Sequence, residues 1–103
     1  MRRGEVRWYK FAKPDKKRPV LILTRDSVLD YLGEVTVAPI TTTVRDIPSE
    51  VALSRADGVH HDCAINCDHV QTASKGKIGA LITMLPPARL AAVSRAVRFA
   101  LII

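Results

Sequence analysis

The chain has 103 residues, 48% of them hydrophobic, so it is long enough for one small folded domain, residues 1–103, and too apolar to be disordered. Its formal net charge of +6 favours a polyanionic partner such as a nucleic acid, although a basic surface without a partner fits the charge equally well. No apolar run reaches the roughly 18 residues of a membrane span, and the N-terminus lacks the apolar core of a signal peptide, so we expect a cytoplasmic protein.

The hydrophobic pattern predicts short strands followed by one helix. Alternating or continuously apolar segments separated by turn residues predict six strands, over residues 5–11, 19–24, 34–42, 49–53, 63–70 and 77–82. A helix over residues 87–101 opens on a proline pair and repeats apolar residues at helical spacing, so it should pack on the sheet. We therefore expect a mainly β fold with a C-terminal helix, built as a compact, strongly curved antiparallel sheet or small barrel. The pairing of the strands cannot be predicted.

The second predicted strand is the most apolar one. Residues 20–23 are aliphatic with no polar break, which favours a strand buried on both faces. Pro19 lacks an N–H for the ladder and therefore fits at the start of the strand. Arg18 is then expected where the chain enters the core, with Lys16 and Lys17 making its approach basic. A guanidinium held there can bind a phosphate bidentately.

Arg18 and Thr41 form the first candidate site. Arg18 begins the second predicted strand and Thr41 ends the third, so the two residues lie at the same end of the sheet if those strands are antiparallel neighbours. A cation and a hydroxyl at one phosphodiester could stabilise the charge that develops during its cleavage. The alternative is a solvated arginine flanking a strand and an ordinary strand threonine, and spacing alone favours this alternative.

The second candidate is a group of metal-ligand residue types: His60, His61, Cys63, Cys67 and His69. Cys63, Cys67 and His69 would be spread along one extended strand, too far apart to close on one ion, so we expect neither a metal nor another cofactor. Buried cysteines that act as small hydrophobic residues are the preferred interpretation. The loop histidines are then solvated, although either could transfer protons near neutral pH.

The third candidate is the polar segment around Asn66 and Asp68. Alternation within a strand over residues 63–70 would place both side chains on one face, where an amide and a carboxylate can read base edges or orient a sugar hydroxyl. An equally acceptable interpretation is that Asp68 makes a turn hydrogen bond.

Five short motifs follow one another along nearly the whole chain. They are Arg3-Gly4-Glu5-Val6, Arg18-Pro19-Val20-Leu21-Ile22-Leu23, Val37-Ala38-Pro39-Ile40-Thr41-Thr42, Ser49-Glu50-Val51 and Asn66-Cys67-Asp68-His69-Val70-Gln71-Thr72. Each motif is weak alone, but the five in this order resemble the MazF/PemK family of toxin endoribonucleases from type II toxin–antitoxin systems.

The resemblance implies a small SH3-like barrel of the CcdB/PemK type with a C-terminal helix, working as a homodimer. It implies cleavage of single-stranded RNA (messenger, ribosomal or transfer RNA) at short specific sequences, without metal, which inhibits translation and growth. The implied chemistry is attack by the ribose 2′-hydroxyl, which leaves a cyclic phosphate. The implied partner is a cognate MazE-like antitoxin whose acidic, largely disordered tail folds onto a basic groove.

The resemblance also implies roles for individual residues. The catalytic arginine and threonine of the family fall on Arg18 and Thr41, with Thr42 as the register alternative. Trp8 and Tyr9 could stack on unpaired bases, although core packing is favoured for Trp8. The residues expected to contact RNA are Lys16, Lys17, Arg25, Thr42, Thr43, Arg45, Asn66 and Gln71.

The general base stays open at this point. The loop before Arg18 is shorter than is usual in the family and lacks its common glutamate, and Asp15 is the only carboxylate there. Some members use an aspartate where Asp68 stands, which makes Asp68 a third catalytic candidate. His60, His61, Asp68 and the substrate itself remain as possible bases. A non-catalytic RNA- or peptide-binding barrel and a gyrase-inhibiting toxin of similar fold are the alternative functions.

Overall fold

A computed structural model describes residues 1–11 and 16–103 of the chain, and the turn predicted at Pro14-Asp15 lies outside the described residues. Within this part of the chain the strands are β1 (Glu5–Lys10), β2 (Lys17–Ile22), β3 (Glu34–Thr41), β4 (Glu50–Leu53), β5 (Cys63–Asn66), β6 (Gln71–Ser74) and β7 (Ile78–Met84). One α-helix follows, α1 (Pro87–Leu101), and the 3-10 turns are η1 (Asp26–Val28), η2 (Arg55–Asp57), η3 (Cys67–His69) and η4 (Lys75–Lys77). The predicted class, mainly β with a terminal helix, is confirmed.

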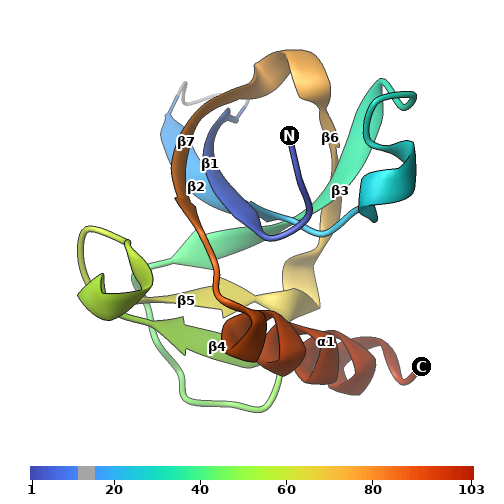
Figure 1. Cartoon of the computed structure of the whole chain (residues 1–103). Coiled ribbons are helices and arrows are strands. Elements are labelled where there is room, and N and C mark those ends of the chain that lie inside the picture. The colour runs from blue at the N-terminus through green and yellow to red at the C-terminus, as the bar shows by residue number, and fades with distance from the viewer. Residues whose placement is uncertain (12–15) are drawn as a thin grey trace.

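All strand pairs are antiparallel, in the order β4-β5-β3-β2-β1-β7, with β6 pairing with β3 as well. The strands β1, β2, β3, β6 and β7 curve around a common axis, and β4, β5 and α1 stack together at one end of them (Figure 1). This arrangement is the strongly curved sheet expected from the sequence, and only the structure supplies its pairing.

Strand β3 changes partners along its length. Residues 34–37 pair with β6, whereas Ile40 and Thr41 pair with β5. Pro39 falls between the two paired stretches and opposite Val20 of β2. The sequence requires an edge or a bulge for this proline because it has no N–H for the ladder. On this side of β3 the partner changes from β6 to β5, so Pro39 lies at a gap in the pairing even though it is inside the sheet.

Strand β2 is buried on both faces, as predicted. Val20, Leu21 and Ile22 are all fully buried. Leu21 packs in the hydrophobic cluster that includes Val93 of α1, whereas Val20 and Ile22 pack in a second cluster on the other face of the sheet. Packing on both faces fixes the strand tightly, so the exposed residues at its start, including Arg18, extend from a rigid base.

The C-terminal helix has the predicted bounds. Pro87 occupies the first turn, where a missing N–H costs nothing, and Val93 and Ala96 are buried against the strands. Leu101, in the last turn, is 47% exposed because it borders an open groove of about 580 Å³ that residues of β3 and β6 also line. None of the helices in the described part of the chain has the length and hydrophobicity to cross a bilayer.

The single strand predicted over residues 63–70 is wrong. Strand β5 ends at Asn66, the chain turns through η3, and the separate strand β6 follows. The cause is local: the side-chain oxygen of Asn66 accepts a hydrogen bond of 3.0 Å from the backbone N–H of Asp68 and so caps the turn. The described residues therefore hold seven strands rather than six, and the last one runs to Met84 instead of residue 82.

Candidate active site

A pocket of about 220 Å³ opens where the start of β2 and the end of β3 meet residues 59–63. Six of the twelve residues that line it are apolar, among them Trp8, Pro19 and Ile40. The polar half consists of Lys17, Arg18, Thr41, Thr42, His60 and His61. A small pocket with an apolar wall and a few convergent polar groups is the usual form of a ligand site.

The register of β2 against β3 brings Arg18 and Thr41 together. Val20 lies opposite Pro39, and continuing this antiparallel register by two residues places Arg18 opposite Thr41. Both residues line the pocket, so the expectation that they share one end of the sheet is confirmed in its geometry. Arg18 is exposed and forms no ion pair with any described residue, which leaves its guanidinium available for an external anion.

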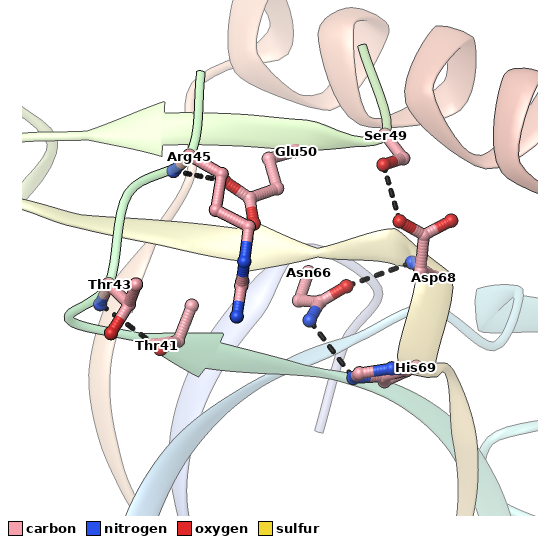
Figure 2. A network of polar contacts seen from close by, with 8 residues as sticks. All are labelled: Thr41, Thr43, Arg45, Ser49, Glu50, Asn66, Asp68 and His69. Atoms are coloured by element: carbon pink, nitrogen blue, oxygen red, sulfur yellow. Dashed lines mark hydrogen bonds and ion pairs between the residues drawn. The ribbon is translucent and has the colours of Figure 1, made fainter. Parts of the chain in front are cut away.

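The hydroxyl of Thr41 is held by its own loop. Its Oγ1 accepts a hydrogen bond of 3.1 Å from the backbone N–H of Thr43 (Figure 2). Because a hydroxyl is both donor and acceptor, its hydrogen remains available to donate to a ligand oxygen. Thr42 also lines the pocket, so it remains the register alternative. Thr43 is exposed and does not line the pocket, but its backbone N–H holds the Thr41 hydroxyl that does.

Arg45 stands outside this pocket and already has a partner. Its Nη1 lies 3.0 Å from Oε2 of Glu50, and its backbone N–H donates to the other carboxylate oxygen at 2.9 Å (Figure 2). The Glu50 side chain is only 2% exposed, whereas that of Arg45 is 52% exposed. The ion pair thus neutralises a buried carboxylate and leaves the outer face of the guanidinium in solvent.

Asn66 and Asp68 belong to a separate network that does not line the pocket. Ser49 Oγ donates to Asp68 Oδ2 at 2.5 Å, and Asn66 Nδ2 lies 3.0 Å from Nδ1 of His69 (Figure 2). The structure therefore does not gather Asp68 with Arg18 and Thr41. The turn hydrogen bond considered for Asp68 is made by the side chain of Asn66 instead, and the carboxylate accepts from Ser49.

The remaining residues expected to contact RNA are dispersed. Lys16 is exposed beside the pocket, Gln71 is exposed at the start of β6, and Arg25 lines a second groove of about 580 Å³ together with Arg3 and Arg98. Of the two aromatic residues considered for stacking, Trp8 lines the pocket. Tyr9 packs in the second hydrophobic cluster, edge to face against Phe11 with ring centroids 4.8 Å apart.

The cysteines are buried and free. Burial, together with nearby carboxylates, raises the pKa of both thiols, and that of Cys67 reaches about 11. Both are therefore neutral, unreactive thiols near pH 7. In the described part of the chain, no three His, Cys, Asp or Glu side chains are grouped closely enough to hold a metal ion.

The two loop histidines occupy a defined place that the sequence does not indicate. His60 and His61 line the pocket together with Arg18 and Thr41. No spacing in the sequence links them to residues so far along the chain, because residues 59–63 reach the pocket through the pairing of β4 with β5 and of β5 with β3.

Three comparisons with known proteins bear on this site. Residues 2–101 match the family model described as PemK-like, MazF-like toxin of type II toxin–antitoxin system. Endoribonuclease MazF3 of Mycobacterium tuberculosis is 46% identical over 74 residues, 72% of either chain. The solved Mycobacterium tuberculosis toxin MazF-mt6 has a TM-score of 0.88 at 36% identity, over 96% of this chain and 97% of that one. An endoribonuclease from a mycobacterial species, solved in complex with its cognate antitoxin, has a TM-score of 0.90 at 25% identity, over 100% and 96% of the two chains.

Proposed function

The chain belongs to the PemK-like, MazF-like family of type II toxins, and on that premise we propose that it is an endoribonuclease toxin neutralised by a cognate antitoxin. The observation that carries the proposal is the shared pocket of Arg18 and Thr41, the two positions to which the sequence resemblance assigns catalysis. We further propose that residues 1–103 act as one toxin domain, that two copies form a homodimer, and that the protein works in the cytoplasm, where its RNA targets are.

Arg18 and Thr41 would act on the phosphate that is cleaved. The guanidinium binds two non-bridging oxygens and stabilises the extra negative charge of the transition state, and the Thr41 hydroxyl donates to one of these oxygens. The ribose 2′-oxygen attacks the adjacent phosphorus and the bond to the 5′-oxygen breaks, which leaves a 2′,3′-cyclic phosphate and a 5′-hydroxyl. Because these side chains and Lys17 supply the positive charge and the hydrogen bonds, we propose that the reaction needs no metal.

The form of the pocket supports a single-stranded substrate. It is a small pocket of about 220 Å³, and Trp8 among its apolar lining residues would offer an aromatic ring on which an unpaired base can stack. The other expected RNA contacts lie outside the pocket and would hold the flanking nucleotides through the phosphate backbone and base edges. They are Lys16, Arg25, Thr43, Arg45, Asn66 and Gln71.

The test is RNA cleavage by the purified protein in the presence of EDTA. The wild type should cut single-stranded RNA at short recurring sequences and leave a cyclic phosphate, and a 2′-deoxy substitution at the cleaved nucleotide should block cutting. Arg18→Ala and Thr41→Val should each slow cleavage about 10²- to 10³-fold, as the loss of one donor to a developing oxyanion usually does.

Arg95→Ala is the matched control, because Arg95 is an exposed arginine on α1 outside the pocket. Cleavage that survives Arg18→Ala undiminished would remove Arg18 from the mechanism. Binding of many RNA sequences without strand scission would point to a binding module, and inhibition of gyrase without RNA cleavage would point to a toxin of that other class.

The proposed antitoxin is an acidic partner. A net charge of +6 attracts a polyanionic protein segment as it attracts RNA, so the two would compete for the basic surface around Arg18 and Lys17. Titration calorimetry with the product of the adjacent upstream gene tests this idea. A tight complex that stops RNA cleavage is expected, and the absence of any binding heat and of inhibition would contradict it.

A further inference from the structure

Cleavage by a 2′-hydroxyl requires two proton transfers that Arg18 and Thr41 do not supply. The 2′-hydroxyl must lose its proton as its oxygen bonds to phosphorus, and the 5′-oxygen must gain a proton as its bond to phosphorus breaks. An arginine keeps its proton at any physiological pH, and a threonine hydroxyl is a hydrogen-bond donor rather than an acid or base near neutrality. The side chains that line the pocket beside Arg18 and Thr41 are therefore the groups to consider for these transfers.

In the described part of the chain, no carboxylate is placed to transfer protons at the pocket. No Asp or Glu is found among the described residues that line the pocket. Asp68, the carboxylate suggested by the family resemblance, accepts the Ser49 hydroxyl in the network beneath α1. Glu50 and Asp57 are paired with Arg45 and Arg89, respectively.

Two other ionisable groups of the pocket are also unsuited. Cys63 is only 5% exposed, and burial raises the pKa of its thiol, so it stays protonated. Lys17 is an exposed lysine that adds positive charge to the pocket and has no lone pair with which to accept the 2′-hydroxyl proton. Among the described residues that line the pocket, His60 and His61 are the two imidazoles, and imidazole is the side chain that ordinarily exchanges protons between about pH 5 and pH 8.

We propose that His60 and His61 carry out the proton transfers of RNA cleavage at the Arg18–Thr41 pocket, one as base and the other as acid. The neutral imidazole takes the 2′-hydroxyl proton while the O–P bond forms, and the imidazolium gives its proton to the leaving 5′-oxygen while the P–O bond breaks. The reaction consumes no other reagent, and a proton exchange with solvent restores both rings. This inference rests on the proposed endoribonuclease function.

The segment that presents the histidines is firmly built. The Ser54 side chain and the Asp57 side chain cap η2 reciprocally, and Arg89 Nε of α1 contacts Asp57 Oδ1 at 3.0 Å. Gly58 has φ of 94°, and a Cβ there would lie 2.3 Å from Thr83 Oγ1, so only glycine fits between η2 and β7.

The next residues lead directly into the pocket. Val59 is 8% exposed and packs in the main hydrophobic cluster, and Arg55 Nε donates to the His60 carbonyl oxygen at 3.1 Å. The charged groups around the two rings are Lys17 and Arg18 across the pocket, Arg55 on the same loop, and Asp62, the next residue in the chain.

The experiment measures single-turnover cleavage of a short RNA by the wild type, His60→Ala, His61→Ala and the double variant from about pH 5 to about pH 9. A second substrate carries sulfur in place of the 5′-bridging oxygen, because a thiolate leaves without a proton. His69→Gln is the control, since His69 lies outside the pocket and the amide can still hydrogen-bond. Thermal unfolding of each variant checks that the exposed substitutions leave the fold intact.

We expect each single variant to lose at least about 10²-fold in rate and one limb of a bell-shaped pH profile. The sulfur substrate should restore the rate of the variant that lacks the acid and not that of the variant that lacks the base. The proposal is overturned if the double variant keeps the wild-type rate, or if the rate falls while the bell-shaped profile persists and neither variant is restored. If the wild type itself cuts no RNA, the proposed function fails, a result separate from both.

Discussion

The pocket at the start of β2 and the network under α1 differ in what their polar groups bind. In the network, Ser49, Asn66, Asp68 and His69 satisfy one another, with separations of 2.5 to 3.0 Å. In the pocket, Arg18 forms no ion pair with a described residue, and Thr41 keeps a hydrogen to donate. Polar groups satisfied within the chain stabilise the fold, whereas groups left open toward a cavity can bind a ligand. The sequence resemblance marks both regions, and the structure separates them by this criterion.

The strongest test of the comparison is Arg18→Lys. A lysine keeps the charge but loses the planar fork that grips two phosphate oxygens, so we expect cleavage to slow about 10²-fold or more. The midpoint of thermal unfolding should stay unchanged, because Arg18 is exposed and makes no internal ion pair with the described residues. Single-turnover kinetics and calorimetry measure the two quantities. A variant that cleaves at the wild-type rate would show that charge alone suffices.

Ser49→Ala should show the opposite pattern. Ser49 is 3% exposed and donates to the Asp68 carboxylate, so its loss should lower the free energy of unfolding by about 1–2 kcal/mol. The cleavage rate per folded molecule should not change, since neither residue lines the pocket. Denaturant titration beside the cleavage assay gives both numbers. A large loss of cleavage rate at unchanged stability would instead indicate that Asp68 takes part in catalysis.

Arg89→Ala tests how the pocket side is supported, because Arg89 of α1 pairs with Asp57 in the segment that leads to His60 and His61. Burial alone would raise the pKa of Asp57, but the hydrogen bond and charge of Arg89 and the Ser54 N–H lower it below the usual value of 3.8. A carboxyl group whose pKa is lower in the folded than in the unfolded protein stabilises the fold at pH values above its unfolded-state pKa. This stabilisation is lost as the pH falls through the folded-state pKa.

We therefore expect the free energy of unfolding of Arg89→Ala to be about 1–2 kcal/mol lower than that of the wild type at neutral pH. On acidification below about pH 4, the variant should lose less additional stability than the wild type. Arg95→Ala, on the same helix and outside the pocket, serves as the control. Denaturant titrations at several pH values measure the effect. Parallel pH dependence in the wild type and Arg89→Ala would show that the ion pair does not set the Asp57 pKa.

The smallest expected effect concerns the hydrogen bond that holds Thr41. Thr43→Pro removes the N–H that Thr41 Oγ1 accepts, whereas Thr43→Ala keeps it. Since a single hydrogen bond contributes about 1 kcal/mol, the proline variant should cleave about fivefold more slowly than the alanine variant. Equal rates in the two variants would show that this contact does not orient the hydroxyl.

The sequence alone sufficed for features that depend on near neighbours. A continuous aliphatic run predicted that Val20, Leu21 and Ile22 are buried on both faces of β2, and the structure confirms it. Helical spacing behind a proline pair predicted α1 to the residue. Five ordered motifs led to the family, which the comparison with its model confirms, and to Arg18 and Thr41 as the residues that we propose for catalysis. Local pattern failed at Asn66, where one side-chain hydrogen bond turns the chain and splits the expected strand into β5 and β6.

Only the tertiary structure decided which distant segments meet. Strand register brings Arg18 opposite Thr41, and the pairing of β4, β5 and β3 carries His60 and His61 to the same pocket while Asp68 joins Ser49 elsewhere. Periodicity describes how a residue relates to its neighbours along one element, and it contains no information on contacts between elements. Those contacts are fixed by the combined packing of both sheet faces and by the turns that return the chain, so they exist only in the folded molecule.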